Sequence, residues 1–327
     1  MPPTDASAPP VRLVLDCDTG TDDAVAIMAA VGHPGLDLLA VTTVNGNVAL
    51  PRVTENTLRA LDVVGCTVPV HAGSPRPLLR PDFPIPRDVL NGRDPDFQPA
   101  YLDLPPARSR AASHEAVRFL VDFYRDPAHD DVTLVATAPL TNVALALSVA
   151  PDLRERIPRL VLMGGGVAGG NVTAAAEFNL WVDPEAALIV LEAGIRDVTI
   201  LPLDATQSVP LTLADCDALD ALGTPGAVAA ARLVRHRIEH DPDEERAATY
   251  GPCAPVHDAL CMAALVDPDV VTKSVTCPVK VETSSERTLG ALLLDRRSWS
   301  TDAPNATLAL RADRDRYLAF LTAALGA

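Results

Sequence analysis

Lysine is nearly absent from this 327-residue chain: only Lys273 and Lys280 occur among its 27 basic residues. Acidic residues number 43, which gives a formal net charge of −16. A nucleic-acid partner requires a basic surface for its phosphates, so this balance argues against DNA and RNA. It is compatible with a cation site and a neutral small-molecule substrate, although an acidic surface also serves simple solubility.

Paired cysteines and long apolar runs are also missing. The six cysteines are scattered and form no Cys-x-x-Cys pair, which argues against a disulfide framework or a zinc site and favours a reducing compartment. Residues 1–10 lack the basic and apolar regions of a signal peptide. No stretch approaches the ~18 uncharged apolar residues that a membrane span needs. We therefore expect a soluble, cytoplasmic protein with no membrane partner.

Short apolar runs alternate with helical patterns along the chain, and 48% of the residues are hydrophobic. Near-continuous apolar strands separated by helices are typical of parallel βαβ units that are covered on both faces. We therefore predict an α/β fold with a mainly parallel open sheet flanked by helices, formed by one domain over residues 11–327 after a disordered tail over residues 1–10. The expected strands are 11–15, 38–44, 132–137, 160–163 and 197–201, and the expected helices are 22–31, 51–64, 141–149, 184–193 and 313–325.

Two polar stretches interrupt this alternation. Residues 71–110 are dense in Pro, Asp and Arg, and residues 236–253 are similarly charged, so both are expected to be loops. Loops of this length in compact domains are usually functional. Toward the C-terminus, residues 274–283 and 287–294 are expected to form antiparallel strands.

Four carboxylates follow the first expected strand within eight residues: Asp16, Asp18, Asp22 and Asp23. The carboxyl ends of strands are where open parallel sheets place ligands. Carboxylates held this close repel one another unless a cation or a raised pKa relieves the repulsion. A hard cation such as Ca²⁺ or Mg²⁺ prefers oxygen ligands of this kind, although no EF-hand loop is present. A simpler alternative, strongest for Asp22, is that an aspartate caps the following helix.

Four further polar segments end expected strands or open expected helices. They are Val41-Thr42-Thr43-Val44-Asn45-Gly46-Asn47, Val135-Ala136-Thr137-Ala138-Pro139-Leu140-Thr141-Asn142, the stretch from Leu162-Met163-Gly164-Gly165-Gly166 to Glu185-Ala186, and Val256-His257-Asp258-Ala259. Together with the acidic cluster, this ordered set resembles the inosine-uridine-preferring nucleoside hydrolase family over roughly residues 12–325. The resemblance implies a mainly parallel sheet, a homodimer or homotetramer, bound Ca²⁺ and hydrolysis of the N-glycosidic bond of ribonucleosides.

The resemblance also implies a role for each matching residue. The implied Ca²⁺ ligands are the side chains of Asp18, Asp23 and Asp258 and the backbone carbonyl of Thr137. The implied substrate-binding residues are Asp22 and Asn47 at the ribose hydroxyls and the water, Asn171, Glu177 and Asn179 at the 5′ and 3′ hydroxyls, Met163 as a pocket wall, and Asp258. Asp16 matches a carboxylate that lies behind the ligands and orients them.

Cleavage of a ribosyl C–N bond passes through an oxocarbenium-like state, so the site must hold the sugar and bring a water to C1′. Ca²⁺ would hold the 2′ and 3′ hydroxyls and lower the pKa of the water, although the residues alone do not exclude Mg²⁺. Asp18 is the expected general base, a role that typically contributes ~10²–10⁴-fold. His257 resembles the histidine that protonates the departing base, and its alternative is a capping or core histidine beside Asp258.

Two segments depart from the family pattern. The early loop of the family carries His-Gly-x-Asp-Gly-Leu-Gly, whereas residues 91–97 here read Asn-Gly-Arg-Asp-Pro-Asp-Phe. A second base-facing segment often supplies tyrosines, whereas residues 235–241 read Arg-His-Arg-Ile-Glu-His-Asp. Both regions govern contacts with the nucleobase, so the identity of the base does not follow from the resemblance. Arg237 or His240 could contact the leaving group, and a solvated surface is the alternative.

Two other functions are compatible with the same acidic motif. A Mg²⁺-dependent phosphatase of the haloacid-dehalogenase type also places Asp-x-Asp after its first strand, and Asp16 would then be the nucleophile. That family expects a further lysine, which here could come only from residue 273 or 280. The non-enzymatic alternative is a catalytically degenerate protein that binds ribose or Ca²⁺.

Overall fold

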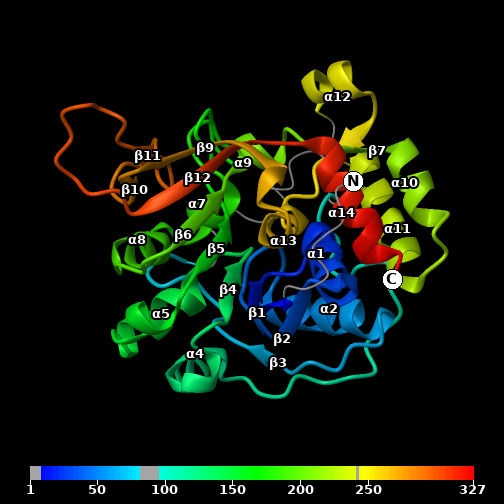
Figure 1. Cartoon of the computed structure of the whole chain (residues 1–327), viewed down its shortest axis with the longest axis horizontal. Helices are drawn as coiled ribbons and strands as arrows, with labels where there is room; N and C mark the ends of the chain where they lie inside the picture. The colour runs from blue at the N-terminus through cyan, green and yellow to red at the C-terminus, as the bar shows by residue number, and fades with distance from the viewer. Residues whose placement is uncertain (1–8, 82–95, 241–242) are drawn as a thin grey trace.

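A computed structural model describes residues 9–81, 96–240 and 243–327, so the first eight residues of the expected tail lie outside the described residues. An eight-stranded sheet runs through the molecule in the order β3-β2-β1-β4-β5-β6-β12-β9 (Figure 1). Neighbouring strands pair in parallel except β12 and β9, which are antiparallel. The predicted mainly parallel sheet is therefore confirmed. Its strands are β1 (Val11–Cys17), β2 (Leu36–Thr43), β3 (Val70–Ala72), β4 (Thr133–Ala136), β5 (Leu160–Met163), β6 (Val198–Leu201), β9 (Val271–Cys277) and β12 (Ala306–Ala312).

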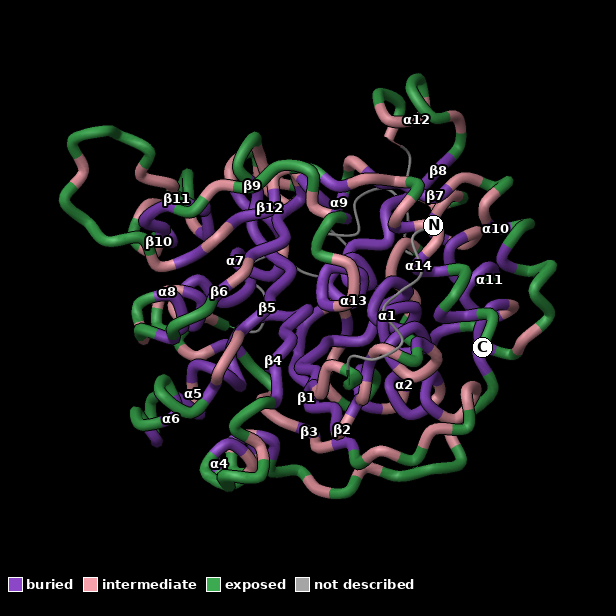
Figure 2. The backbone as a smooth tube through the Cα atoms, in the orientation of Figure 1, coloured by how far each residue is buried: buried purple, intermediate pink, exposed green. Residues whose placement is uncertain are grey.

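Alternate residues of the central strands enter two separate hydrophobic cores. Leu13 of β1 and Val135 of β4 belong to one core, whereas Val14 and Leu134 belong to the other. Figure 2 shows the strands as a buried layer inside the molecule. Because both faces are covered, these strands read as near-continuous apolar runs. The first core is closed by α1 (Thr21–Gly32), α2 (Leu50–Val63), α10 (Leu213–Asp220), α11 (Pro225–His240), α13 (Ala259–Val266) and α14 (Arg314–Leu325), and the second by α4 (Ala116–Arg125), α5 (Thr141–Val149), α6 (Leu153–Arg156) and α8 (Pro184–Glu192).

Short elements complete the described part of the chain. Two small antiparallel sheets pair β7 with β8 and β10 with β11. Within the described ranges, no helix is long and apolar enough to cross a membrane. The short elements are α7 (Phe178–Val182), α9 (Leu203–Thr206), α12 (Glu244–Tyr250), β7 (Leu211–Thr212), β8 (Cys253–Ala254), β10 (Val279–Val281), β11 (Leu292–Leu294) and the 3₁₀ turns Pro127–His129 and Pro268–Val270.

The polar stretch over residues 236–253 is largely helical, so the predicted loop there is wrong. Helix α11 continues to His240, and α12 follows after residues 241–242, which lie outside the described residues. The loop was predicted from the charged residues of this stretch, but some of these side chains face solvent and others face the interior. Arg235 donates to the Asp217 carboxylate at the surface (2.8 Å), whereas Arg237 is buried. Sequence polarity alone does not separate these two environments.

The strand predicted over residues 274–283 belongs to two different sheets. Residues up to Cys277 form β9 at the edge of the main sheet, and the chain resumes after Pro278 as β10, which pairs with β11. Proline lacks the N–H that a sheet ladder needs, which explains the break. The second predicted strand, 287–294, is reduced to its last three residues. The strand β12, which no prediction included, lies between β6 and β9.

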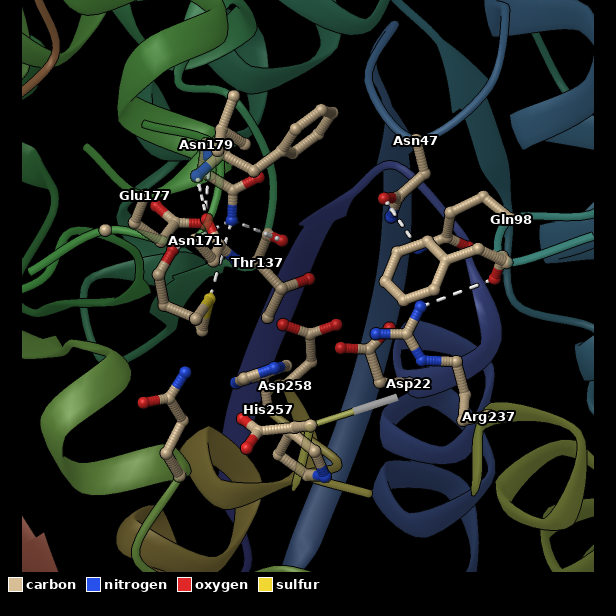
Figure 3. Close-up of a pocket in the computed structure, with 18 of the residues that line it drawn as sticks. Asp22, Asn47, Gln98, Thr137, Asn171, Glu177, Asn179, Arg237, His257 and Asp258 are labelled. Atoms are coloured by element: carbon tan, nitrogen blue, oxygen red, sulfur yellow. Dashed lines mark hydrogen bonds between the residues drawn. The ribbon is translucent and has the colours of Figure 1, made fainter. Parts of the chain in front are cut away.

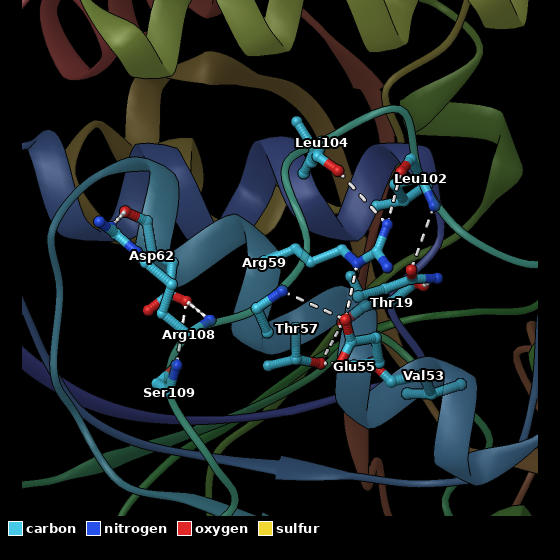
Figure 4. A network of polar contacts seen from close by, with 12 residues as sticks. Thr19, Val53, Glu55, Thr57, Arg59, Asp62, Leu102, Leu104, Arg108 and Ser109 are labelled. Atoms are coloured by element: carbon cyan, nitrogen blue, oxygen red, sulfur yellow. Dashed lines mark hydrogen bonds and ion pairs between the residues drawn. The ribbon is translucent and has the colours of Figure 1, made fainter.

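Helix α2 holds the chain that re-enters the described structure at residue 96 (Figure 4). Arg59 donates to the carbonyls of Leu102 and Leu104 (3.3 Å each). Asp62 accepts the N–H groups of Arg108 and Ser109. Residues 102–109 therefore lie fixed along the helix, and this anchoring sets where the preceding residues 97 and 98 reach.

Candidate active site

The carboxyl ends of the parallel strands border a cavity of about 730 Å³ (Figure 3). Asp18 and Asp23 are buried and are not among the residues that line it. The other predicted site residues all do line it: Asp22, Asn47, Thr137, Met163, Asn171, Glu177, Asn179, His257 and Asp258. The structure thus brings residues from all five of the predicted polar segments to one place.

Three carboxylates form the acidic centre of this cavity. Ligand oxygens of Asp22, Asp23 and Asp258 all lie within 4.8 Å of one another. Burial raises the pKa of Asp23 to about 7, and the charge of Asp22 adds to this. Burial, together with the charges of Asp22 and Asp23, holds the pKa of Asp258 well above its usual range. Three carboxylates at this separation repel one another unless a proton or a cation lies between them.

Asp18 adds a fourth carboxylate next to this group. Its Oδ2 accepts the backbone N–H of Asn47 (2.6 Å), whereas its Oδ1 is buried and has no hydrogen-bond partner among the described residues. Burial, with the charge of Asp23, raises the pKa of Asp18 well above its usual range. Buried polar atoms are normally hydrogen-bonded, so an orphaned carboxylate oxygen beside three further carboxylates fits a hard divalent cation.

Asp23 is held in one orientation by donors on three sides. Its Oδ2 accepts the N–H of Gly20 (3.0 Å), and its Oδ1 accepts the Thr137 hydroxyl (2.9 Å). The amide of Asn47 donates to Oδ2 at 3.4 Å. The Thr137 carbonyl, the expected backbone ligand, accepts the Asn179 amide at 3.1 Å and has a second lone pair to offer.

Asp16 lies behind the cluster. It is fully buried, and its Oδ1 accepts the Thr42 hydroxyl (2.5 Å) and the Asn142 amide (2.8 Å). Burial raises the pKa of Asp16 to about 6, partly offset by these two donors. Asp16 does not line the cavity, and one of its oxygens is held by two donors, which agrees with its expected orienting role.

A second group of residues follows β5 on one side of the acidic centre. Glu177 caps α7 by accepting the N–H of Asn179 (2.9 Å), and its other oxygen accepts the N–H of Gly165 (2.7 Å). Gly165 has φ +77, a conformation that favours glycine. Burial raises the pKa of Glu177 to about 7, against the effect of these donors. The Asn179 amide also donates to the Met163 carbonyl (3.2 Å), so both polar side chains are fixed.

Asn171 completes this group from an exposed position, where its Oδ1 accepts the N–H of Phe178 (3.0 Å). His257 lines another part of the cavity. Its Nδ1 lies 2.7 Å from the Thr206 hydroxyl, which fixes the orientation of the ring. Both side chains line the cavity. Their expected roles, at a ribose hydroxyl for Asn171 and at the departing base for His257, stay predictions.

Several lining residues were not predicted. Gln98 donates to the Asn47 side chain (3.0 Å), and Gln207 ends α9, the short helix after β6. Gln207 lies beyond a helix, so the rule that polar groups directly after strands face the site does not reach it. Gln98 had no sequence signal either, because its place depends on the anchoring to α2. The segment 91–97 is one of the two that differ from the family pattern. Its residues 91–95 lie outside the described residues, while Phe97 lines the cavity.

Comparison with known proteins identifies relatives along almost the whole chain. The inosine-uridine preferring nucleoside hydrolase family matches residues 13–319. A pyrimidine-specific ribonucleoside hydrolase RihA from Enterobacter sp. (strain 638) is 38% identical over 94% of this chain and 96% of its own. A purine-preferring ribonucleoside hydrolase from Gardnerella vaginalis has a TM-score of 0.84 at 28% identity, covering 96% of this chain and 98% of its own. A plant nucleoside hydrolase, PpNRh1, has the same TM-score and identity, covering 98% and 100%.

Proposed function

The chain belongs to the inosine-uridine preferring nucleoside hydrolase family and is an N-glycosyl hydrolase of ribonucleosides, and we propose that it works through a Ca²⁺ ion held by the buried carboxylates. The observation that carries the proposal is the orphaned Oδ1 of Asp18 beside the three clustered carboxylates. A bound cation would remove their mutual repulsion. Ca²⁺ accepts six to eight oxygen ligands in flexible geometry, which suits a mixed set of carboxylates and a carbonyl.

The proposed ligands are Asp18, Asp23, Asp258 and the Thr137 carbonyl. Asp22 shares the 4.8 Å cluster with Asp23 and Asp258, so it is a further candidate ligand. Asp22 also lines the cavity, whereas Asp18 and Asp23 lie behind it. This difference supports the assignment of Asp22 to a ribose hydroxyl and of the two buried carboxylates to the ion.

The chain's own groups then divide the reaction between them. Glu177 and Asn179, with Asn171 beside them, bind the far end of the ribose, and Asn47 with Asp22 binds its hydroxyls near the acidic centre. A bound Ca²⁺ would lower the pKa of a water and hold the 2′ and 3′ hydroxyls. Asp18 accepts the proton of that water as its oxygen bonds to C1′. The surrounding carboxylates stabilise the positive charge that develops on the sugar.

His257 is proposed to protonate the departing base. Its Nδ1 is engaged with Thr206, so the ring is held in one orientation, and a group of this kind suits proton transfer near neutral pH. Loss of purine but not pyrimidine turnover in His257→Ala, or the reverse, would assign the proton to one class of base. Equal retention of both activities would remove His257 from the mechanism.

The direct test of the activity is ribose release from a panel of ribonucleosides, measured as reducing sugar. We expect release by the wild-type protein and a loss of at least about 10²-fold in Asp18→Asn, because the general base is removed. A wild-type protein that releases no ribose from any nucleoside contradicts the proposal. If that inactive protein still bound ribose, it would be a degenerate binding homologue.

Two further proposals concern the whole protein. The family resemblance supports a homodimer or homotetramer, which light scattering after gel filtration would measure. The six cysteines are free, which agrees with a reducing cytoplasm. A monomer at micromolar concentration would contradict the first of these proposals.

A further inference from the structure

A second cavity of about 580 Å³ adjoins the cavity of the active site. Four residues line both cavities: Gly170, Gln207, Asp243 and Arg246. The remaining wall of the second cavity comes from the loop after β5, from α9 and from α12, which projects from the body of the molecule in Figure 1. The residues that line only this second cavity have no part in the proposed hydrolysis, so its ligand is unassigned.

The two cavities adjoin next to the residues proposed to bind the far end of the ribose. Gly170 borders both cavities and directly precedes Asn171, the residue proposed to lie at the 5′ hydroxyl. Asn171 is held there because its Oδ1 accepts the N–H of Phe178 (3.0 Å). The base leaves from C1′, on the side of His257. A group attached to C5′ and extended past Gly170 would therefore enter the second cavity.

One wall of the second cavity is a loop that α9 holds in place. The Asp204 carboxylate on α9 accepts the N–H groups of Val167 (2.7 Å) and Ala168 (3.1 Å). A Cβ atom on Gly170 would overlap the backbone of Ala176, so the loop closes tightly on itself at this point. Hydrogen bonds from backbone N–H groups to a carboxylate are strong. This wall is therefore fixed, and the cavity does not depend on a ligand to form it.

The opposite wall, on α12, sets the charge that the cavity accepts. Glu245 and Thr249 are one helical turn apart, and Tyr250 follows with 39% of its surface exposed. Arg246 lines the same cavity, but it donates to the carboxylate of Asp243 at 3.1 Å. Glu245 makes no ion pair with any described residue. A carboxylate beside an aromatic ring attracts a cation and repels an anion.

We propose that the second cavity binds a chain that is attached to C5′ of the ribose and ends in an ammonium group. The substrates then include ribonucleosides in which an ether or thioether chain replaces the 5′ hydroxyl. The reaction itself is unchanged: the water oxygen bonds to C1′, the C1′–N bond breaks, the base leaves with a proton, and the chain stays on the released sugar. The proposal rests on the proposed function, because the ribose must occupy the acidic centre for C5′ to lie beside Gly170.

The test uses inosine and two derivatives of it that carry an aminopropylthio or a carboxyethylthio chain at C5′. At low salt, kcat/KM of the wild type should be about fivefold higher for the amine than for the carboxylate, the upper effect of an exposed charge pair. Glu245→Lys should reverse this order and leave inosine turnover within about twofold. The matched control is Glu239→Lys, the same change at an exposed position of α11, which should keep the wild-type order.

A second variant fills the cavity without touching the ribose. A Cβ atom on Gly169 would meet only the Ala174 carbonyl oxygen, at 3.6 Å, so a side chain fits there. Gly169→Leu should lower kcat/KM at least about tenfold for both derivatives and spare inosine. An amine-to-carboxylate ratio that Glu245→Lys leaves unchanged would overturn the proposal, while inosine turnover keeps the proposed function intact. The same holds if Gly169→Leu impairs only nucleosides with a bulky group on the base.

Binding of the product sugar tests the cavity without turnover. Calorimetry should show that 5-thioribose bearing the aminopropyl chain binds the wild type more tightly than ribose does, and that Glu245→Lys removes the difference. Equal binding of the two sugars to the wild type would overturn the proposal. If the wild type cleaves no nucleoside but binds the extended sugar in this Glu245-dependent way, the proposed function alone is overturned.

Discussion

The Asp18 carboxylate occupies space that a side chain at position 46 would fill. A Cβ atom on Gly46 would overlap the Asp18 carboxylate, whose Oδ2 already accepts the neighbouring N–H of Asn47. The loop after β2 therefore passes directly over the proposed general base. The conformation of Gly46 does not demand glycine, so the requirement is for space alone. This close approach explains the glycine at position 46. The motif Val44-Asn45-Gly46-Asn47 alone could not reveal it.

Gly46→Ala should lower kcat at least about 10²-fold, because Asp18 must move and misplacement by about 1 Å is enough for such a loss. The matched control is Gly169→Ala, where the nearest atom to an added Cβ is the Ala174 carbonyl oxygen at 3.6 Å, an ordinary contact. Steady-state ribose release from both variants measures the difference. Wild-type activity in Gly46→Ala would show that Asp18 is not held as described.

At the scale of elements, α2 links the site to the chain that borders it. Asn56 is fully buried: its amide donates to the Thr19 carbonyl (3.3 Å), and its Oδ1 accepts the N–H of Leu102 (3.1 Å). Thr19 precedes α1 within the acidic motif, and Leu102 belongs to the segment anchored beside Arg59. One side chain therefore joins the turn that carries the acidic motif to the chain that carries Phe97.

Asn56→Ala should lower the free energy of unfolding by about 1–3 kcal/mol, because it leaves a buried N–H and a buried carbonyl without partners. It should also raise KM for nucleosides, since Phe97 and Gln98 lose their support. Arg118→Ala on α4 is the control: its ion pairs are exposed, so unfolding should change by less than about 0.5 kcal/mol. Urea denaturation gives both values, and equal stability of Asn56→Ala and wild type would contradict this account.

The strands β1, β4, β5 and β6 could be predicted because each buries both faces, which produces a readable apolar run. The site residues after those strands followed from the same pattern and from the family motif. The split at Pro278 and the missed β12 were harder, because strand pairing depends on partners far away in the chain. Arg237 was ambiguous for a related reason: which face of α11 meets the cavity is decided by packing against α1 and α10.

The whole molecule has a net charge of −16, and several of its carboxylates are buried with raised pKa values. The pKa values of Asp23 and Glu177 stand at about 7 in the folded protein, above the ~4 of an unfolded chain. The folded state thus binds more protons than the unfolded state between these values. Stability without metal is therefore lost as pH rises from about 4 through 7.

Calorimetric melting should show this loss directly. The metal-stripped protein should melt about 2–3 °C lower at pH 8 than at pH 5, the shift that a change of about 1–2 kcal/mol gives for a chain of 327 residues. Ca²⁺ at about 100 times its Kd should restore about 2.7 kcal/mol at pH 8. Sodium chloride at equal ionic strength separates binding of a divalent cation from screening. A stripped protein that is more stable at pH 8 than at pH 5 would contradict the description of the cluster.

The central claim is that buried carboxylates hold one divalent cation on which ribose release depends. The most direct measurement titrates Ca²⁺ into the metal-stripped protein and follows ribose release together with the heat of binding. The account predicts that activity appears in parallel with one bound ion per chain, and that Asp23→Asn loses both binding and activity. Full ribose release by the stripped protein in the presence of a chelator would contradict it.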